Sequence, residues 1–157
     1  MTMLDAFNWL ELTAVGAAVR DSLWLFPVIE AGHLLGLTLL GGSILAVDLH
    51  LLGFGLRERS VAYVIEQIRP WLYAAILVMI VTGIPLFLSE AVKCYFSEAF
   101  WLKMKTFPIA VVYTIAIRAW VAKQGADLGP WIGRVLAIFS IALWLTVAAA
   151  GRWIGFS

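Results

Sequence analysis

Four long apolar stretches constrain this chain more than any other feature of its sequence. They run from about Trp24 to Leu52, from Trp71 to Ser89, from about Phe100 to Val121 and from about Pro130 to Phe156. A helix needs about 20 such residues to cross the hydrocarbon of a bilayer. Because 63% of the 157 residues are apolar and only 13% are charged, a water-soluble fold could not cover this surface. We therefore expect an all-α integral membrane four-helix bundle, with residues 1–157 forming a single membrane domain.

The segment before these stretches, residues 3–18, has a different pattern. Its apolar residues recur at the helical period, whereas Asp5, Asn8 and Glu11 fall at other positions. The segment is too short and too polar to span a bilayer. It is expected to form an N-terminal amphipathic interfacial helix that lies on the membrane surface.

The basic residues predict how the bundle lies in the membrane. Short connectors that are rich in arginine and lysine usually face the cytoplasm. Two connectors on one side of the predicted bundle contain or adjoin Arg57, Arg59, Arg69, Arg118, Lys123 and Arg134. We therefore expect a multi-pass protein of the bacterial inner membrane with both termini in the periplasm. The net charge of +1 gives no basis for a nucleic-acid partner, so the lipid bilayer is the expected environment.

Ionisable residues in the first stretch are the strongest sign of function. Such groups are costly within a membrane, and they usually face the interior of a bundle and have a role there. With about 100° between successive helical residues, Glu30 and Asp48 each lie about 60° from His33. These three residues therefore share one face of the first predicted helix. His50 lies off that face and about 25 Å from His33 along a straight helix, so the two histidines cannot bind one metal ion.

The residues alone leave two interpretations of His33. It is either a neutral imidazole hydrogen-bonded to a carbonyl or to Glu30, or a ligand to a cofactor. Small residues leave space on the same helix, either for a neighbouring helix or for a flat macrocycle; they are Gly36, Gly41, Gly42 and Ser43. A haem is the macrocycle that a histidine most commonly binds through its metal.

Other helices offer candidate residues at a similar depth. Met79 lies as deep as His33 on its own helix, and it or Met104 is a candidate for the sixth ligand of a haem iron. Lys105 and Arg152 lie closer to the membrane surface, where the propionates of such a haem would emerge. Snorkelling to the interface is the ordinary alternative for both cations. Lys103 and Lys105 point in different directions on a helix, so at most one of them is expected to face the interior. Lys105 is the better candidate because Trp101 precedes it by one helical turn.

These residues resemble a known family. His33-Leu34-Leu35-Gly36 in the first span and Trp101-Leu102 with Lys105 at the start of the third are similar to the HemJ-type membrane proteins, and the related CopD-like proteins share the layout. The resemblance implies a four-helix haem-binding bundle, in a family associated with protoporphyrinogen oxidation. It makes His33 the essential histidine and Lys105 the essential lysine, and it matches Thr82-Gly83 to the glycine region of the second span.

One part of the family's pattern is missing. The arginine near the end of the first span has no counterpart, because Asp48, Leu49 and His50 occupy that stretch. Haem binding, rather than the same oxidase reaction, is therefore what the resemblance predicts for this chain.

The sequence thus predicts a haem b-binding redox protein in which His33 binds the iron, with Glu30, Met79, Trp101, Lys105 and Arg152 around the cofactor. The electrons would pass to or from a quinone, a redox partner protein or a porphyrin-like substrate, which would make the chain a haem-dependent oxidoreductase. Two alternatives remain open. One is a non-catalytic membrane scaffold or subunit, including a homo-oligomer, that packs through its glycine-rich helix faces. The other is the handling of copper or another ion.

Overall fold

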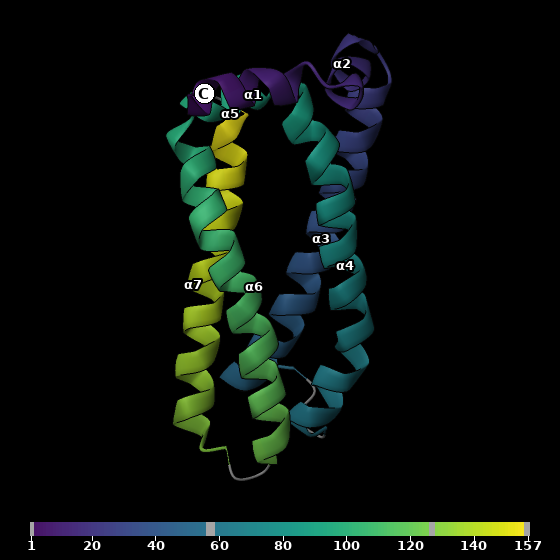
Figure 1. Ribbon diagram of the computed structural model, residues 1–157. Coiled ribbons are helices and arrows are strands. Elements are labelled where there is room, and N and C mark those ends of the chain that lie inside the picture. The colour runs from purple at the N-terminus through teal and green to yellow at the C-terminus, as the bar shows by residue number, and fades with distance from the viewer. Residues whose placement is uncertain (1, 56–58, 126–127, 156–157) are drawn as a thin grey trace.

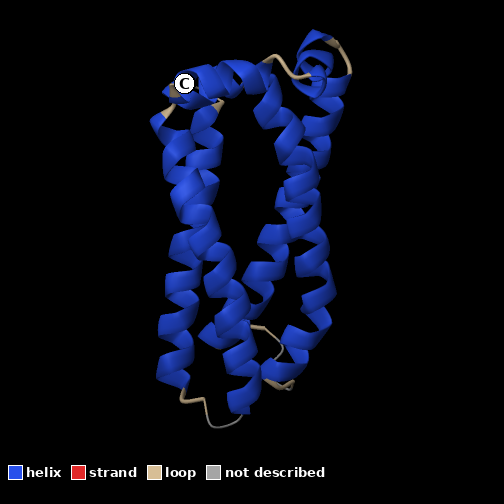
Figure 2. Cartoon of the chain, viewed as in Figure 1, coloured by secondary structure: helices blue, strands red, loops and turns tan. Residues whose placement is uncertain are grey.

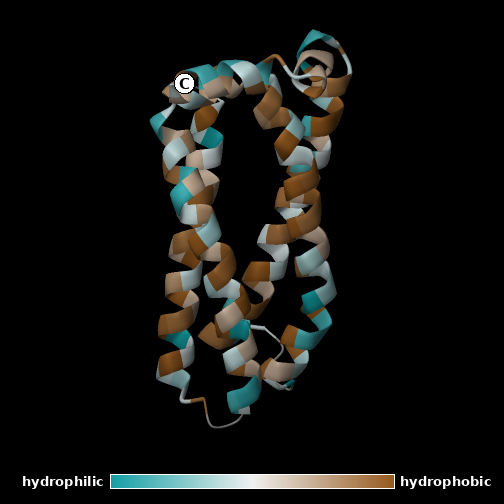
Figure 3. Cartoon of the chain, in the orientation of Figure 1, coloured by the Kyte–Doolittle hydropathy of each residue, from teal (hydrophilic) through white to brown (hydrophobic). Residues whose placement is uncertain are grey.

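The computed structural model describes residues 2–55, 59–125 and 128–155. Within these ranges every regular element is a helix and there is no strand (Figure 2). Four helices are long and apolar enough to cross a membrane: α3 (Leu25–Leu52), α4 (Val61–Ser89), α6 (Glu98–Gln124) and α7 (Pro130–Ile154). Hydrophobic residues dominate the middle of these helices (Figure 3). The prediction of an all-α bundle with four apolar spans is confirmed, and the arrangement fits a multi-pass membrane protein.

The long helices run alternately up and down between two ends of the molecule (Figure 1). We call the end that carries the short helices the α1 end, and the end with the α3–α4 and α6–α7 connections the loop end. At the loop end, α3 stops at Gly53, whose φ of 92° is left-handed and is therefore readily adopted only by glycine. Helix α7 starts at Pro130, which suits a first helical position because proline lacks a backbone donor.

Helix α4 begins earlier than the charge-free stretch predicted. It starts at Val61 rather than Trp71 and continues through Pro70 and Pro85. The hydroxyl of Ser60 accepts a hydrogen bond from the backbone N–H of Tyr63 at 3.2 Å, which stabilises the first turn. The polar first turns of α4 therefore form helix rather than a connector.

The N-terminal segment forms two short helices, so the predicted single helix over residues 3–18 is wrong. Helix α1 spans Met3–Glu11 and α2 spans Ala14–Asp21. Thr13 separates them because its hydroxyl donates to the Leu10 carbonyl and also accepts from the N–H of Gly16. The same hydroxyl therefore ends one helix and begins the next.

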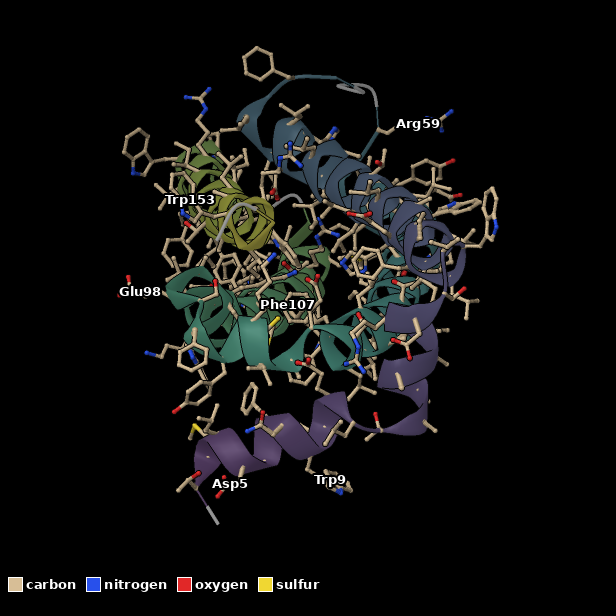
Figure 4. The ribbon with its side chains drawn as sticks, turned by 90° about the horizontal axis from the view of Figure 1, so that it is seen from above. Asp5, Trp9, Arg59, Glu98, Phe107 and Trp153 are labelled. Carbon is tan, nitrogen blue, oxygen red and sulfur yellow. The ribbon has the colours of Figure 1, made fainter. Side chains whose placement is uncertain are left out.

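Helix α1 lies across the α1 end, beside the short helix α5 (Ala91–Phe96) (Figures 1 and 4). Its Phe7 makes aromatic contacts with four rings: Phe87, Tyr95, Phe100 and Trp101. At its other end Glu11 accepts a hydrogen bond from the backbone N–H of Val92 at 2.7 Å. The outer side of α1 stays exposed, as Asp5 and Trp9 show (Figure 4).

The four long helices form two pairs, α3 with α4 and α6 with α7 (Figure 1). The ribbons of the two pairs lie apart toward the α1 end and converge toward the loop end. One buried cluster joins α3 to α4 and consists of Leu40, Ile44, Leu72, Ala75 and Met79. A second joins α3, α4 and α6 near the loop end and consists of Val47, Val64, Ile65 and Val121. The two clusters therefore lie in the middle of the bundle and toward its loop end.

Candidate functional site

His33 contacts α4 through a hydrogen bond to Thr82. Its Nδ1 lies 2.8 Å from the Thr82 hydroxyl oxygen, and that hydroxyl donates its own proton to the Val78 carbonyl at 2.6 Å. A hydroxyl has one proton to donate, so toward His33 the Thr82 oxygen acts as the acceptor. Nδ1 therefore carries the imidazole proton, and the lone pair of Nε2 remains available to a ligand.

Two glycines let the histidine and α4 approach closely. A methyl group at Gly83 would lie 3.3 Å from Cε1 of His33, and one at Gly32 would lie 3.7 Å from the Thr82 methyl group. The imidazole thus rests on α4 where that helix lacks a side chain. Thr82 and Gly83, which the family resemblance matched to the glycine region of the second span, are the two residues of α4 that contact His33.

The structure brings Lys103, not Lys105, into the interior. Lys105 is exposed, whereas Lys103 is half-buried, and a methyl group at Gly151 would lie 3.4 Å from the Lys103 ammonium nitrogen. The charge of Lys103 is close enough to act on His33. The expectation for Lys105 is corrected because Trp101, one turn before it, is held toward α5 by a 3.0 Å hydrogen bond from Nε1 to the Tyr95 carbonyl.

The other predicted residues lie away from His33 or face outward. Glu30 is exposed, as is Arg152. Met79 is buried between α3 and α4, and its sulfur would lie 3.4 Å from a methyl group at Gly36, one helical turn from His33. Met104 is 40% exposed. The structure therefore does not place either methionine across an open space from the histidine.

Glu30 departs from the expectation because its angular position is at the edge of the shared face. The position of about 60° from His33 is inward only if the neighbouring helix covers that side, and α3 packs mainly against α4 and α7. Asp48, at the same angle but near the loop end, is buried because the helices converge there.

A stripe on α6 supplies the interior cations, and the sequence contains its signal. Lys103 and Arg118 are separated by 15 residues, or about 60° around a helix, so they lie on the same side of α6. The positions between and beyond them follow helical spacing and are half-buried or buried: Phe107, Ala110, Thr114 and Val121. Phe107 lies among the long helices, whereas Glu98 and Trp153 point outward (Figure 4). This helical spacing is the signal in the sequence that Lys103 and Arg118 face the interior.

Cys94, in α5, is buried near the α1 end. Burial, with a smaller contribution from the charge of Glu90, raises the pKa of its thiol to about 11. A protonated thiol is a poor metal ligand. Across the part of the chain that the structure describes, His, Cys, Asp and Glu do not gather in groups of three or more that could hold a metal ion, which leaves copper handling with few ligands.

Comparison with known proteins gives a family but no characterised relative. No curated protein and no solved structure matches the chain. A family model matches residues 6–157, almost the whole chain, and the chain therefore belongs to this family of unknown function (DUF6644).

Proposed function

We propose that this chain is a haem b-binding redox protein of a bacterial inner membrane, with His33 as an axial ligand of the haem iron. The observation that carries the proposal is the hydrogen bond from Nδ1–H of His33 to Thr82, whose own proton goes to Val78. Histidines that bind metals usually donate their other ring N–H to a protein acceptor, which fixes the tautomer and the ring orientation. His33 has this arrangement, with Nε2 left for the iron.

The surroundings of His33 suit a flat, dianionic group. Phe107 provides an aromatic side chain among the long helices (Figure 4). The Lys103 ammonium lies against α7 and acts on His33, and it would pair with a propionate. Lys105 and Arg152 are exposed at the same end and would meet only a carboxylate that reaches the surface.

A bound haem would supply an iron centre that accepts and donates single electrons. The chain would hold the imidazole in one tautomer, pack Gly83 against it and place one cation nearby. Because Met79 and Met104 lie elsewhere, the proposal names one axial ligand from this chain. A quinone, a partner protein or a porphyrin-like substrate would exchange electrons with the haem.

The proposed orientation places the loop end in the cytoplasm and both termini in the periplasm. Arg59, Arg69, Lys123 and Arg134 are exposed at or near the loop end, as the distribution of basic residues in multi-pass proteins favours. The haem would then lie nearer the periplasmic surface. Attachment of a periplasm-active or cytoplasm-active reporter to each terminus tests this orientation directly.

Absorption spectra of the purified, dithionite-reduced protein test the haem proposal. We expect a Soret band and a reduced α band, and His33→Ala should remove both while the protein remains folded. His50→Ala is the matched control, because this half-buried histidine lies near the loop end of the same helix. A wild-type protein that stays colourless after expression with a haem supply, or a His33→Ala spectrum like the wild type, would refute the proposal. A colourless protein that co-purifies with other chains would favour a membrane scaffold, and metal analysis would detect copper.

A further inference from the structure

A second set of ionisable side chains is buried far from His33, between α3, α6 and α7. Asp48 is 3% exposed and Arg118 is 8% exposed. The Asp48 carboxylate and the Arg118 guanidinium attract each other, and the carboxylate also interacts with the Ser140 side chain of α7. Asp48 and His33 are 15 residues apart on α3, or about 22 Å along a helix, so this site is separate from the proposed haem site.

The Asp48 carboxylate is incompletely satisfied. Among the residues that the structure describes, its Oδ2 has no hydrogen-bond partner. Each buried polar atom without a partner is costly, and an isolated charge inside a membrane is more costly still. Asp48 is also the one buried carboxylic residue within the described ranges, since the other Asp and Glu residues there are exposed or half-buried.

Arg118 is not a hydrogen-bond partner of Oδ2, and part of its guanidinium bonds to backbone. One of its terminal nitrogens donates to the Ser43 and Ile44 carbonyls, each at 3.2 Å. These contacts hold α6 against α3 and fix the cation beside the carboxylate. The fixed cation disfavours a second positive ion at the same place, so a metal cation is a poor occupant of the site.

A small cavity opens beside the unsatisfied oxygen. It measures about 10 Å³ and is lined by residues that include Asp48, Tyr113, Thr114, Arg118 and Ser140. The rest of its lining is apolar. The volume is close to the minimum that holds one water molecule, and the carboxylate, hydroxyl and guanidinium groups around it provide the polar partners that a water needs. Water, or a proton delivered by water, is therefore the occupant that the size and polarity of the cavity fit.

We propose that Asp48 is a proton-binding site within the membrane, loaded and unloaded through a single water in this cavity. The water in the cavity gives a proton to Oδ2 as it takes one from a hydronium ion at the loop end, which becomes water, while the carboxylate becomes a carboxylic acid. No electron moves in this step. Release reverses it. The site lies four residues from the end of α3 at Leu52, about 6 Å along the helix, which makes the loop end the nearer source of protons.

Three neighbouring helices present side chains to Asp48, and these side chains differ in charge. Helix α6 presents Arg118, the cation already described, and Tyr113, whose hydroxyl donates to the Leu136 carbonyl at 2.9 Å. Helix α7 presents Ser140, and α4 contributes the apolar side chain of Ile65 to the cavity lining. Asp48 is therefore the group in this lining that exchanges a proton while the cation beside it stays in place.

Infrared difference spectroscopy of the whole protein in lipid vesicles tests the proposal. When the pH is lowered, the wild type should gain a carbonyl-stretch band at the high frequency of an acid with few hydrogen bonds, and the band should move in deuterium oxide. Labelling with ¹³C-aspartate should also move it, which limits the source to the four aspartates of the chain. Asp48→Asn should lose the band, whereas the control Asp21→Asn, at an exposed surface residue, should keep it.

The outcomes are distinct from those of the haem experiment. Loss of the band in Asp48→Asn but not in Asp21→Asn supports the proposal, whether or not the protein contains haem. A wild type with no high-frequency acid band at any pH overturns it, because Asp48 then stays ionised beside Arg118. A band that does not respond to ¹³C-aspartate also overturns it, and this result needs no variant to fold.

Discussion

The α1 end and the loop end of the bundle treat their ionisable side chains in opposite ways. Near the α1 end the helix pairs lie apart, and His33 uses one ring nitrogen for Thr82 and keeps the other available. Toward the loop end the helices converge, and Asp48 and Arg118 are almost fully buried. The first half thus carries the histidine that we propose as a haem ligand, whereas the second carries a buried charge pair beside a cavity of about 10 Å³.

Helix α6 connects the two halves. Its interior face carries Lys103 toward the first and Arg118 toward the second. Between them Thr114 accepts a hydrogen bond from the Trp144 indole at 2.9 Å, which ties α6 to α7. We therefore expect substitutions on this face of α6 to have different consequences at the α1 end and at the loop end of the bundle.

Replacement of Arg118 should have the largest effect on stability. Arg118→Leu removes the cation beside a buried carboxylate and two hydrogen bonds to α3. Breaking a buried charge pair in this way costs roughly 3 to 5 kcal/mol, so the melting temperature in detergent should fall sharply. Asp48→Asn in the same chain should recover part of the loss, because no unpaired charge is then left.

Arg134→Leu is the matched control for this prediction, since Arg134 is exposed toward the same end of the bundle. Its effect should lie within about 0.5 kcal/mol of zero. Equal melting temperatures for the two leucine variants would show that the loop-end half is not held together by its buried charges.

Gly16→Ala should loosen the covering of the α1 end. A methyl group there would lie 2.6 Å from the Leu88 carbonyl oxygen and 2.9 Å from that of Glu11. Because both obstacles are backbone, α2 must shift, at a cost of about 1 to 3 kcal/mol. Limited proteolysis should then cut the N-terminal segment faster than in the wild type.

Gly42→Ala provides the comparison, since nothing lies within 4 Å of a methyl group at that position. Alanine should be neutral or stabilising there by up to about 1 kcal/mol, because it favours helix. Similar proteolysis of both variants would mean that α2 does not depend on close contact with α4.

Thr82→Val should weaken haem binding without removing it. The variant keeps the shape of the side chain but loses the acceptor for Nδ1–H of His33. Loss of such a supporting contact lowers affinity by roughly tenfold or more, which a haem titration followed at the Soret band would measure. Thr146→Val, which removes another exposed hydroxyl bonded to its own helix, should bind haem as the wild type does.

The smallest effect concerns Cys94 and the accessibility of the α1 end. Its pKa is raised from 9.0 to about 11 by burial, so the folded protein should react slowly with iodoacetamide at pH 9 and faster once unfolded. Between pH 9 and pH 11 the unfolded chain loses the thiol proton first, and the folded state should become less stable as the pH rises. Alkylation at the same rate with and without denaturant would show that the region beneath α1 is open to water.

The spans could be predicted from sequence because length and hydropathy alone determine them. The short helices at the α1 end were harder, since the break at Thr13 depends on which backbone groups one hydroxyl contacts. Which of Lys103 and Lys105 faces the interior depends on how α6 is rotated about its own axis. That rotation depends on the packing of Trp101 against Phe7 of α1, a contact between helices that are distant in sequence.

The interior site was predicted in part. The sequence indicated an interior role for His33, but its hydrogen-bond partner is Thr82 rather than a carbonyl or Glu30, and its role as a haem ligand remains a proposal. The sequence predicts that Arg118 adjoins a cytoplasmic connector, because other basic residues border the same connector. Its burial follows from the convergence of the helices, which a single helix pattern does not contain.

The hydrogen bond from Val92 to Glu11 has a consequence for how the protein is made. The two residues are 81 positions apart, so α1 leaves the ribosome long before its binding partner exists. Until α4 has crossed the bilayer and α5 has emerged, α1 has only the lipid surface to rest on. Its docking is therefore a late event in biogenesis, and a tag that restrains the N-terminus would interfere with the final closure of the bundle rather than with insertion of the first span.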